Sequence, residues 1–186
     1  MHNGKAEFGI GAGLVAASGL VMAVGAPRFH YGFECFDENG ELKWTDEFDN
    51  LVTTAGKNDL LDKYFKGSAY TAAWYVGLID ADTSYTTGPA AGDTASSHGG
   101  WVESTAYSNG TRPALTLGTP SAGSVNNSGS VAAFSINGTD SIKGAFVISN
   151  STKGGTTGIL YSAGAFAADR SVVSGDTLNV TITLSV

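Results

Sequence analysis

The residues best able to do chemistry are few in this chain and lie far apart. Histidines occur at positions 2, 30 and 98, and Cys35 is the only cysteine. No histidine belongs to an HExxH or HxH pattern of the kind that zinc sites use, and the sequence has no GxSxG elbow of a serine hydrolase. Cys35 lies in an aromatic run typical of buried strands. We therefore predict no enzyme activity, no catalytic residues, no metal site and no cofactor.

Carboxylates gather between residues 34 and 49, where paired acids could cleave a glycosidic bond if they lay on facing walls. The cluster surrounds the sequence DENG at 37–40, whose Asn-Gly pair predicts a tight turn in a β-hairpin over residues 28–48. A calcium loop starting at Asp37 would need glycine at its sixth position, where Leu42 stands. Turn chemistry on a solvated edge therefore explains these acids. The acids of a later loop are also expected to be solvated: Asp80, Asp82 and Asp93.

Four aromatic residues are candidates for ligand binding. Aromatic rings can stack on the faces of sugar rings, although packing in a core is the commoner role of such residues in strands. Both interpretations stay open for the four: Trp74, Tyr75, Trp101 and Tyr107.

The N-terminal segment 8–24 contains no charged residue. It resembles the core of a signal peptide, but only Lys5 precedes it, Glu7 offsets that charge, and no clear A-x-A cleavage site follows. A membrane span needs about 20 apolar residues, and this run is short and rich in glycine, which disfavours a helix by about 1 kcal/mol per residue. We predict an extended apolar arm over residues 1–27 and no membrane span.

An apolar arm is unfavourable in water, so it should lie on a partner or on the core of its own domain. Gly9, Gly11 and Gly13 would share one face of a strand and let another backbone come close. We predict that the arm binds a partner, and an ordinary first strand of the domain is the alternative. The partner-binding side chains are Phe8, Ile10, Leu14, Val15, Leu20, Val21 and Met22.

Residues 28–186 are predicted to form a β-rich domain that contains one helix near residues 55–66. Thr53 or Thr54 can cap the start of this helix, and Gly67 supplies a natural stop. Its apolar side chains should pack on a sheet: Leu60, Leu61, Tyr64 and Phe65. A buried strand at 70–80 and a long loop at 80–100 follow, and loops of this length are usually functional or held by a partner.

The C-terminal half is a run of predicted strands, at 111–118, 130–137, 141–149, 158–166 and 176–186. The last strand alternates apolar residues from Leu178 to Val186 with Thr, Asn and Ser, so one face should be buried and the other wet. The expected fold is mostly β, a two-sheet β-sandwich or jelly-roll-like domain with one short α-helix and an extended N-terminal arm.

Net charge and composition limit the classes of partner that the protein can bind. The net charge is −7, only 15% of residues are charged, and 26 of the 186 residues are glycine. A surface of that sign repels phosphate, so we expect no direct binding of nucleic acid. Glycine favours turns and short strands over helices, which agrees with a β fold.

Two stretches resemble small structural proteins encoded in the virion gene blocks of tailed bacteriophages. The first is WTDEFDNLVTTAGKNDLLDKYFKG followed by AWYVGLI, and the second is IKGAFVIS, TKGGTTGILYSAGAF and SVVSGDTLNVTITLSV in that order. The resemblance covers residues 30–186 and contains no catalytic motif. It implies a location in the virion, after assembly in the cytoplasm of the bacterial host, and a surface role such as capsid decoration or cement.

On this hypothesis the partners are the major capsid protein or other virion subunits. Copies arranged about a symmetry axis would gain avidity from many weak contacts, so a homo-oligomer is also expected. Two other functions remain open: a tail, collar or fibre component, and a carbohydrate-binding module.

Overall fold

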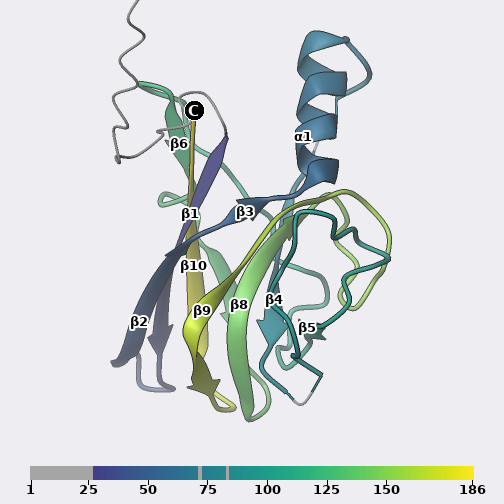
Figure 1. The fold of residues 1–186 in the computed structure, drawn as a ribbon. Helices are drawn as coiled ribbons and strands as arrows, with labels where there is room; N and C mark the ends of the chain where they lie inside the picture. The colour runs from purple at the N-terminus through teal and green to yellow at the C-terminus, as the bar shows by residue number, and fades with distance from the viewer. Residues whose placement is uncertain (1–26, 71–72, 83) are drawn as a thin grey trace, which may run out of the picture.

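The computed structural model describes residues 27–70, 73–82 and 84–186, which form a two-sheet β-sandwich (Figure 1). Neighbouring strands in both sheets are antiparallel. The predicted mostly β, two-sheet fold with one short helix is therefore confirmed. The predicted arm over residues 1–27 lies outside the described residues, apart from Pro27.

The first sheet has the order β2-β1-β10-β6, and β7 also pairs with β10. Its strands are β1 (Arg28–Phe36), β2 (Leu42–Asp49), β6 (Ser124–Asn126), β7 (Ala132–Ser135) and β10 (Thr177–Ser185). The second sheet has the order β3-β9-β8-β4-β5. Its strands are β3 (Leu51–Val52), β4 (Tyr75–Asp80), β5 (Glu103–Ser104), β8 (Asp140–Ile148) and β9 (Leu160–Val172).

The main core lies between the two sheets and follows from alternation in β1 and β10. Tyr31 and Phe33 of β1 are buried and lie opposite Ile182 and Val180 of β10. The hairpin of β1 and β2 and the inward face of the last strand are thus as the sequence predicts. Val186 is the exception on that face, because it lies beyond the last paired residue and is 79% exposed.

The central strand of the second sheet, β8, and its neighbour β4 are buried on both faces. Val76 and Val147 face the main core, whereas Ile79 and Phe146 belong to a second cluster on the outer face of the sheet. Gly77 makes this outer packing fit, because a Cβ atom there would lie 2.1 Å from Cζ of Phe146. We call this second cluster the outer core: Ile79, Ala95, Trp101, Phe146, Ile148, Leu160 and Ala163.

Several predicted strands differ from those of the structure. Residues 111–118 form no strand: they make one bridge, between Ala114 and Tyr75, and Pro113 lacks the N–H that a central ladder would need. The strand predicted at 70–80 begins only at Tyr75. β9 continues to Val172, because the start of β8 supplies a partner for its extension.

The predicted helix is present as α1 (Thr54–Leu60), which continues into one π-helical turn, Leu61–Phe65. Thr53 is the N-cap, since its Oγ1 accepts a hydrogen bond of 3.0 Å from the N–H of Gly56. After the helix, Gly67 adopts a φ of +80°, which favours glycine. The helix and both of its end signals are confirmed.

The face by which the helix meets the sheet differs from the prediction. Gly56 is buried against β9, where an added Cβ would lie 2.5 Å from the backbone oxygen of Tyr161. Because contact is made through this glycine, Leu61, Tyr64 and Phe65 are exposed by 56%, 78% and 73%. The predicted packing of these three residues on the sheet is therefore wrong, and the helix projects beyond one end of the sandwich (Figure 1).

Ile182→Asp should destabilise the domain by more than about 3 kcal/mol, because it places an unpaired charge in the main core. Thr183→Asp, on the other face of β10, should cost only about 1 kcal/mol, because Thr183 is half-buried and aspartate is disfavoured in strands. Thermal denaturation of the two variants tests the register of the last strand. Equal melting temperatures for both would contradict it.

Candidate docking surface

The four aromatic residues proposed as ligand-facing do not share one surface. Trp101 and Tyr107 are 2% and 0% exposed, so of the two interpretations left open for them the structure supports core packing. Trp101 is part of the outer core, and Tyr107 packs edge-on against Phe134 with a centroid distance of 5.0 Å. Trp74 and Tyr75 are half-buried, so of the four only these two are partly exposed.

The long loop at 80–100 covers the outer face of the second sheet. Trp101, at its end, packs on Phe146 with a centroid distance of 5.5 Å and is stacked on His98 at 4.1 Å. Asp93 holds this cover in place, because its Oδ2 accepts hydrogen bonds from Nε1 of Trp101 at 2.8 Å and from the N–H of Ala90 at 2.9 Å. Asp93 is 9% exposed, so the prediction that it is solvated is wrong.

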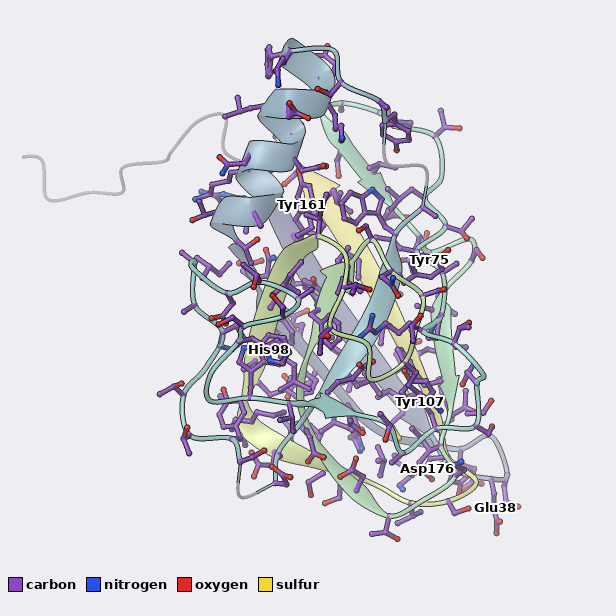
Figure 2. The ribbon with its side chains drawn as sticks, turned by 90° about the vertical axis from the view of Figure 1, so that its right-hand side faces the viewer. Glu38, Tyr75, His98, Tyr107, Tyr161 and Asp176 are labelled. Atoms are coloured by element: carbon purple, nitrogen blue, oxygen red, sulfur yellow. The ribbon has the colours of Figure 1, made fainter. Side chains whose placement is uncertain are left out.

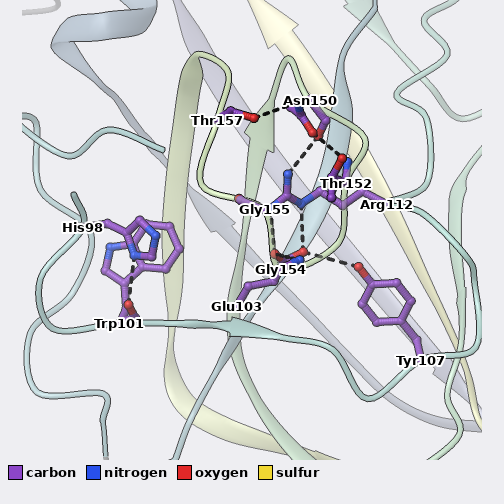
Figure 3. A network of polar contacts seen from close by, with 10 residues as sticks. All are labelled: His98, Trp101, Glu103, Tyr107, Arg112, Asn150, Thr152, Gly154, Gly155 and Thr157. Atoms are coloured by element: carbon purple, nitrogen blue, oxygen red, sulfur yellow. Dashed lines mark hydrogen bonds and ion pairs between the residues drawn. The ribbon is translucent and has the colours of Figure 1, made fainter. Parts of the chain in front are cut away.

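A buried ion pair between Arg112 and Glu103 ties the edge of this cover to the sandwich (Figure 3). Nε of Arg112 donates to Oε1 of Glu103 at 2.8 Å, and Nη2 donates to Oε2 at 2.7 Å. The side chains are 2% and 7% exposed. This two-point geometry offsets the cost of removing both charges from water.

The same ion pair also forms hydrogen bonds with the loop that follows β8. Arg112 donates to the backbone oxygens of Asn150 and Gly155, both at 2.9 Å, and the N–H of Gly154 donates to Glu103 at 2.7 Å. Burial raises the pKa of Tyr107, and the nearby charge of Glu103 adds to the shift, so its hydroxyl stays neutral. Since each polar group here has a partner within the chain, the network fits a structural clamp. No sequence signal indicated it.

The single cysteine, Cys35, belongs to a second cluster of polar side chains around Asp176. Figure 2 shows Asp176 at the end of the sandwich opposite α1. The Asp176 carboxylate accepts from the Cys35 thiol at 3.7 Å, from Lys43 at 2.5 Å and from the N–H of Val173 at 2.9 Å. Burial, with the charge of Asp176 adding to it, raises the pKa of Cys35 to about 12. A thiol of that pKa is a poor nucleophile.

The acidic hairpin edge forms mostly exposed contacts, and the ion pair of Asp46 with Arg170 at 2.6 Å is partly buried. His30 lies 3.0 Å from a carboxylate oxygen of Asp49 and 3.5 Å from one of Glu47. Among residues 27–70, 73–82 and 84–186, no three His, Cys, Asp or Glu side chains gather closely enough to hold a metal ion. No helix in that part of the chain has the length and apolar character to cross a membrane.

An apolar groove lies between α1 and the adjacent ends of β1 and β10. It comprises two cavities of about 280 and 310 Å³. They share four lining residues: Phe29, Leu60, Tyr161 and Leu184. Trp74 lines the first cavity, where its ring meets that of Tyr161 edge-on at 5.0 Å, and Pro27 lines the second. Figure 2 shows Tyr161 beside α1.

The helix adds an exposed apolar patch above this groove, which we call the helix patch: Leu61, Tyr64 and Phe65. Tyr64 and Phe65 contact each other edge-on at 5.0 Å, and Tyr70 nearby is 77% exposed. Groove and helix patch together are the candidate docking surface, because they place large apolar side chains at one end of the molecule. Sequence periodicity identified the helix residues but assigned them to the core.

The arm residues lie outside the described residues, so their binding role stays a prediction. They are Phe8, Ile10, Leu14, Val15, Leu20, Val21 and Met22.

Arg112→Met should destabilise the domain by about 3–5 kcal/mol, because it leaves the Glu103 carboxylate buried without its partner. Replacing Glu103 with Met as well should recover part of that loss, since no lone charge remains. Lys143→Met, which breaks a more exposed pair with Asp169, is the matched control and should cost less than about 1 kcal/mol. Urea unfolding measures all three, and similar losses for Arg112→Met and Lys143→Met would contradict the clamp.

Cys35 in the folded protein should react with iodoacetamide at pH 8.5 roughly a thousandfold more slowly than an ordinary thiol, which is about half ionised there. The folded state holds this proton more tightly, so the free energy of unfolding should also fall as the pH rises from about 9 towards 12. Labelling with and without denaturant, followed by mass spectrometry, measures the ratio. Equal rates in the two conditions would show that the thiol is accessible and ionised.

Comparison of the chain with protein-family models finds no matching family, and comparison with curated proteins finds no matching sequence.

Proposed function

We propose that this chain is a structural building block of a tailed-phage virion, and most specifically a decoration or cement protein that binds the capsid lattice. The observation that carries the proposal is the helix patch, whose large apolar side chains stand exposed on a helix that projects from the sandwich. The resemblance of residues 30–186 to virion structural proteins supports the phage context.

The energetics of the helix patch favour a bound state. Fully burying a side chain of the size of leucine or phenylalanine gains about 1.5–3 kcal/mol. Leu61 is 56% exposed and Phe65 is 73% exposed, so most of this gain is still available. A projecting helix can place such side chains in a groove on a neighbour, which is a recurring mode of protein recognition. The natural partner is therefore a subunit with an apolar cleft, in this proposal the major capsid protein.

The rest of the domain is suited to bear a load. The clamp of Arg112 and Glu103 and the Trp101 cover tie loops to the sheets, and the described residues contain no buried side-chain nitrogen or oxygen without a hydrogen-bond partner. Such tethers raise the free energy of local opening, which a subunit under load requires. Several copies bound about a symmetry axis, as a homo-oligomer, would gain avidity from contacts that are weak one by one.

A tail, collar or fibre component would use the same kind of contact with other virion subunits. Copy number separates the two: a decoration protein is present at lattice stoichiometry, and a tail part in only a few copies per particle. Quantitative mass spectrometry of purified particles gives this number.

Carbohydrate binding is kept as a second candidate function because the groove has several aromatic side chains. Trp74, Tyr64, Tyr70 and Tyr161 line its first cavity together with Asp59 and Lys63. Aromatic faces and a few polar groups are the usual elements of a sugar site. A glycan array tests this function directly, and binding that Trp74→Ala abolishes would favour it over the structural role.

The double variant Leu61→Asp, Phe65→Asp should remain folded and lose binding to particles that lack this protein. Both side chains are exposed and neither lines the groove, so the fold should tolerate the charges. The matched control is Leu42→Asp, because Leu42 is 55% exposed, close to the 56% of Leu61, but begins β2 and lies outside α1 and the groove. Co-sedimentation with the particles measures occupancy. Full occupancy by the double variant, or equal loss in the control, would contradict the proposal.

A further inference from the structure

The groove opens where the described chain begins. Pro27 lines it together with Phe29, Leu60 and Val186. The last pair between β1 and β10 joins Arg28 to Ser185, so the sheet ends next to Pro27. The chain that precedes Pro27 therefore enters the domain at the edge of the groove.

The proline at position 27 also limits the backbone conformation of the residue before it. A residue before proline favours an extended backbone, because the proline ring disfavours the helical region there. An extended chain preceding Pro27 continues the line of β1. The cavity that Pro27 lines is bounded by Leu60 of α1 and by Ser124 and Val125 of β6. Both elements extend past the start of β1 in Figure 1.

The adjoining sequence has the chemistry of the groove. Residues 20–24 read LVMAV, and no charge occurs anywhere in 8–24. Five extended residues cover about 17 Å, and the helical segment from Thr54 to Phe65 is about 18 Å long. An apolar strand of that length would cover the groove side of the helix, where Leu60 and Tyr64 lie.

We propose that residues 20–24 of the same copy occupy the groove between α1 and the ends of β1 and β10. Leu20, Val21 and Met22 supply the apolar contacts to Leu60, Tyr161 and Leu184. The same copy is favoured over a second copy because the segment is tethered next to the groove, and closing so short a connection costs little chain entropy.

This inference goes beyond the proposed function and does not depend on it, since it concerns the isolated chain. It divides the arm into two parts. The proximal part completes the domain, and the distal residues remain for a partner: Phe8, Ile10, Leu14 and Val15.

Photo-crosslinking on the full chain tests the inference. A benzophenone amino acid replaces Met22, and unlabelled and ¹⁵N-labelled copies are mixed, irradiated, digested and analysed by mass spectrometry. We expect crosslinks from position 22 to peptides that contain Leu60, Tyr161 or Leu184, joining two light or two heavy peptides. Leu60→Glu should lower the yield at these sites several-fold, whereas Leu42→Glu, far from the groove, should leave it unchanged.

Three results would overturn the inference. Light–heavy crosslinks to the groove would assign it to a second copy, crosslinks outside the groove would place the segment elsewhere, and absence of any crosslink would show that nothing holds it. Position 21 provides a second probe if the variant at 22 does not fold, as judged by circular dichroism. No virion particles are present, so failure here is distinct from failure of the proposed function.

Discussion

The central strands of the second sheet are apolar on both faces, and the rest of the structure depends on covering both. The inner face of β4 and β8 packs on β1 and β10, as in any two-sheet sandwich. The outer face carries Ile79, Phe146 and Ile148, which would be exposed if the molecule had only two layers. A third layer is therefore needed, and the long loop that ends at Trp101 provides it.

A loop is a weak cover unless something holds it, because few backbone hydrogen bonds order it. Here buried charged groups add to the backbone hydrogen bonds of the loop, such as those from the N–H groups of Thr86 and Thr87 to the oxygen of Gly100. Asp93 fixes the indole of Trp101, and the pair of Arg112 with Glu103 joins the following segment to the loop after β8. These charged groups would be costly if they were unpaired, so their mutual satisfaction makes the cover stable and specific.

In this structure most of the apolar surface of the sandwich is covered, whereas the end with α1 keeps an exposed apolar patch and groove. The long loop, the acidic hairpin and the cysteine are all accounted for by packing, turns or buried hydrogen bonds, and the aromatic residues Trp101 and Tyr107 are part of that packing. The most exposed aromatic side chains, Tyr64, Phe65 and Tyr70, lie at the end with α1, where the chain also enters from its apolar N-terminal segment. One proposal is that the helix patch binds a neighbouring subunit, and the other is that the groove binds the chain's own N-terminal segment. Both therefore concern the same end of the molecule.

The sequence by itself determined the features that depend on local periodicity and turn chemistry. Strict alternation identified the faces of β1 and β10, Asn39-Gly40 identified the hairpin turn, and Thr53 and Gly67 identified the ends of the helix. Only the tertiary structure decided which apolar residues are covered. Leu61 and Trp101 are both large and apolar, yet one is exposed because Gly56 takes the contact with the sheet, and the other is buried because β8 has two apolar faces. Arg112 and Glu103 likewise gain their roles from partners far along the chain, and local spacing carries no information about such contacts.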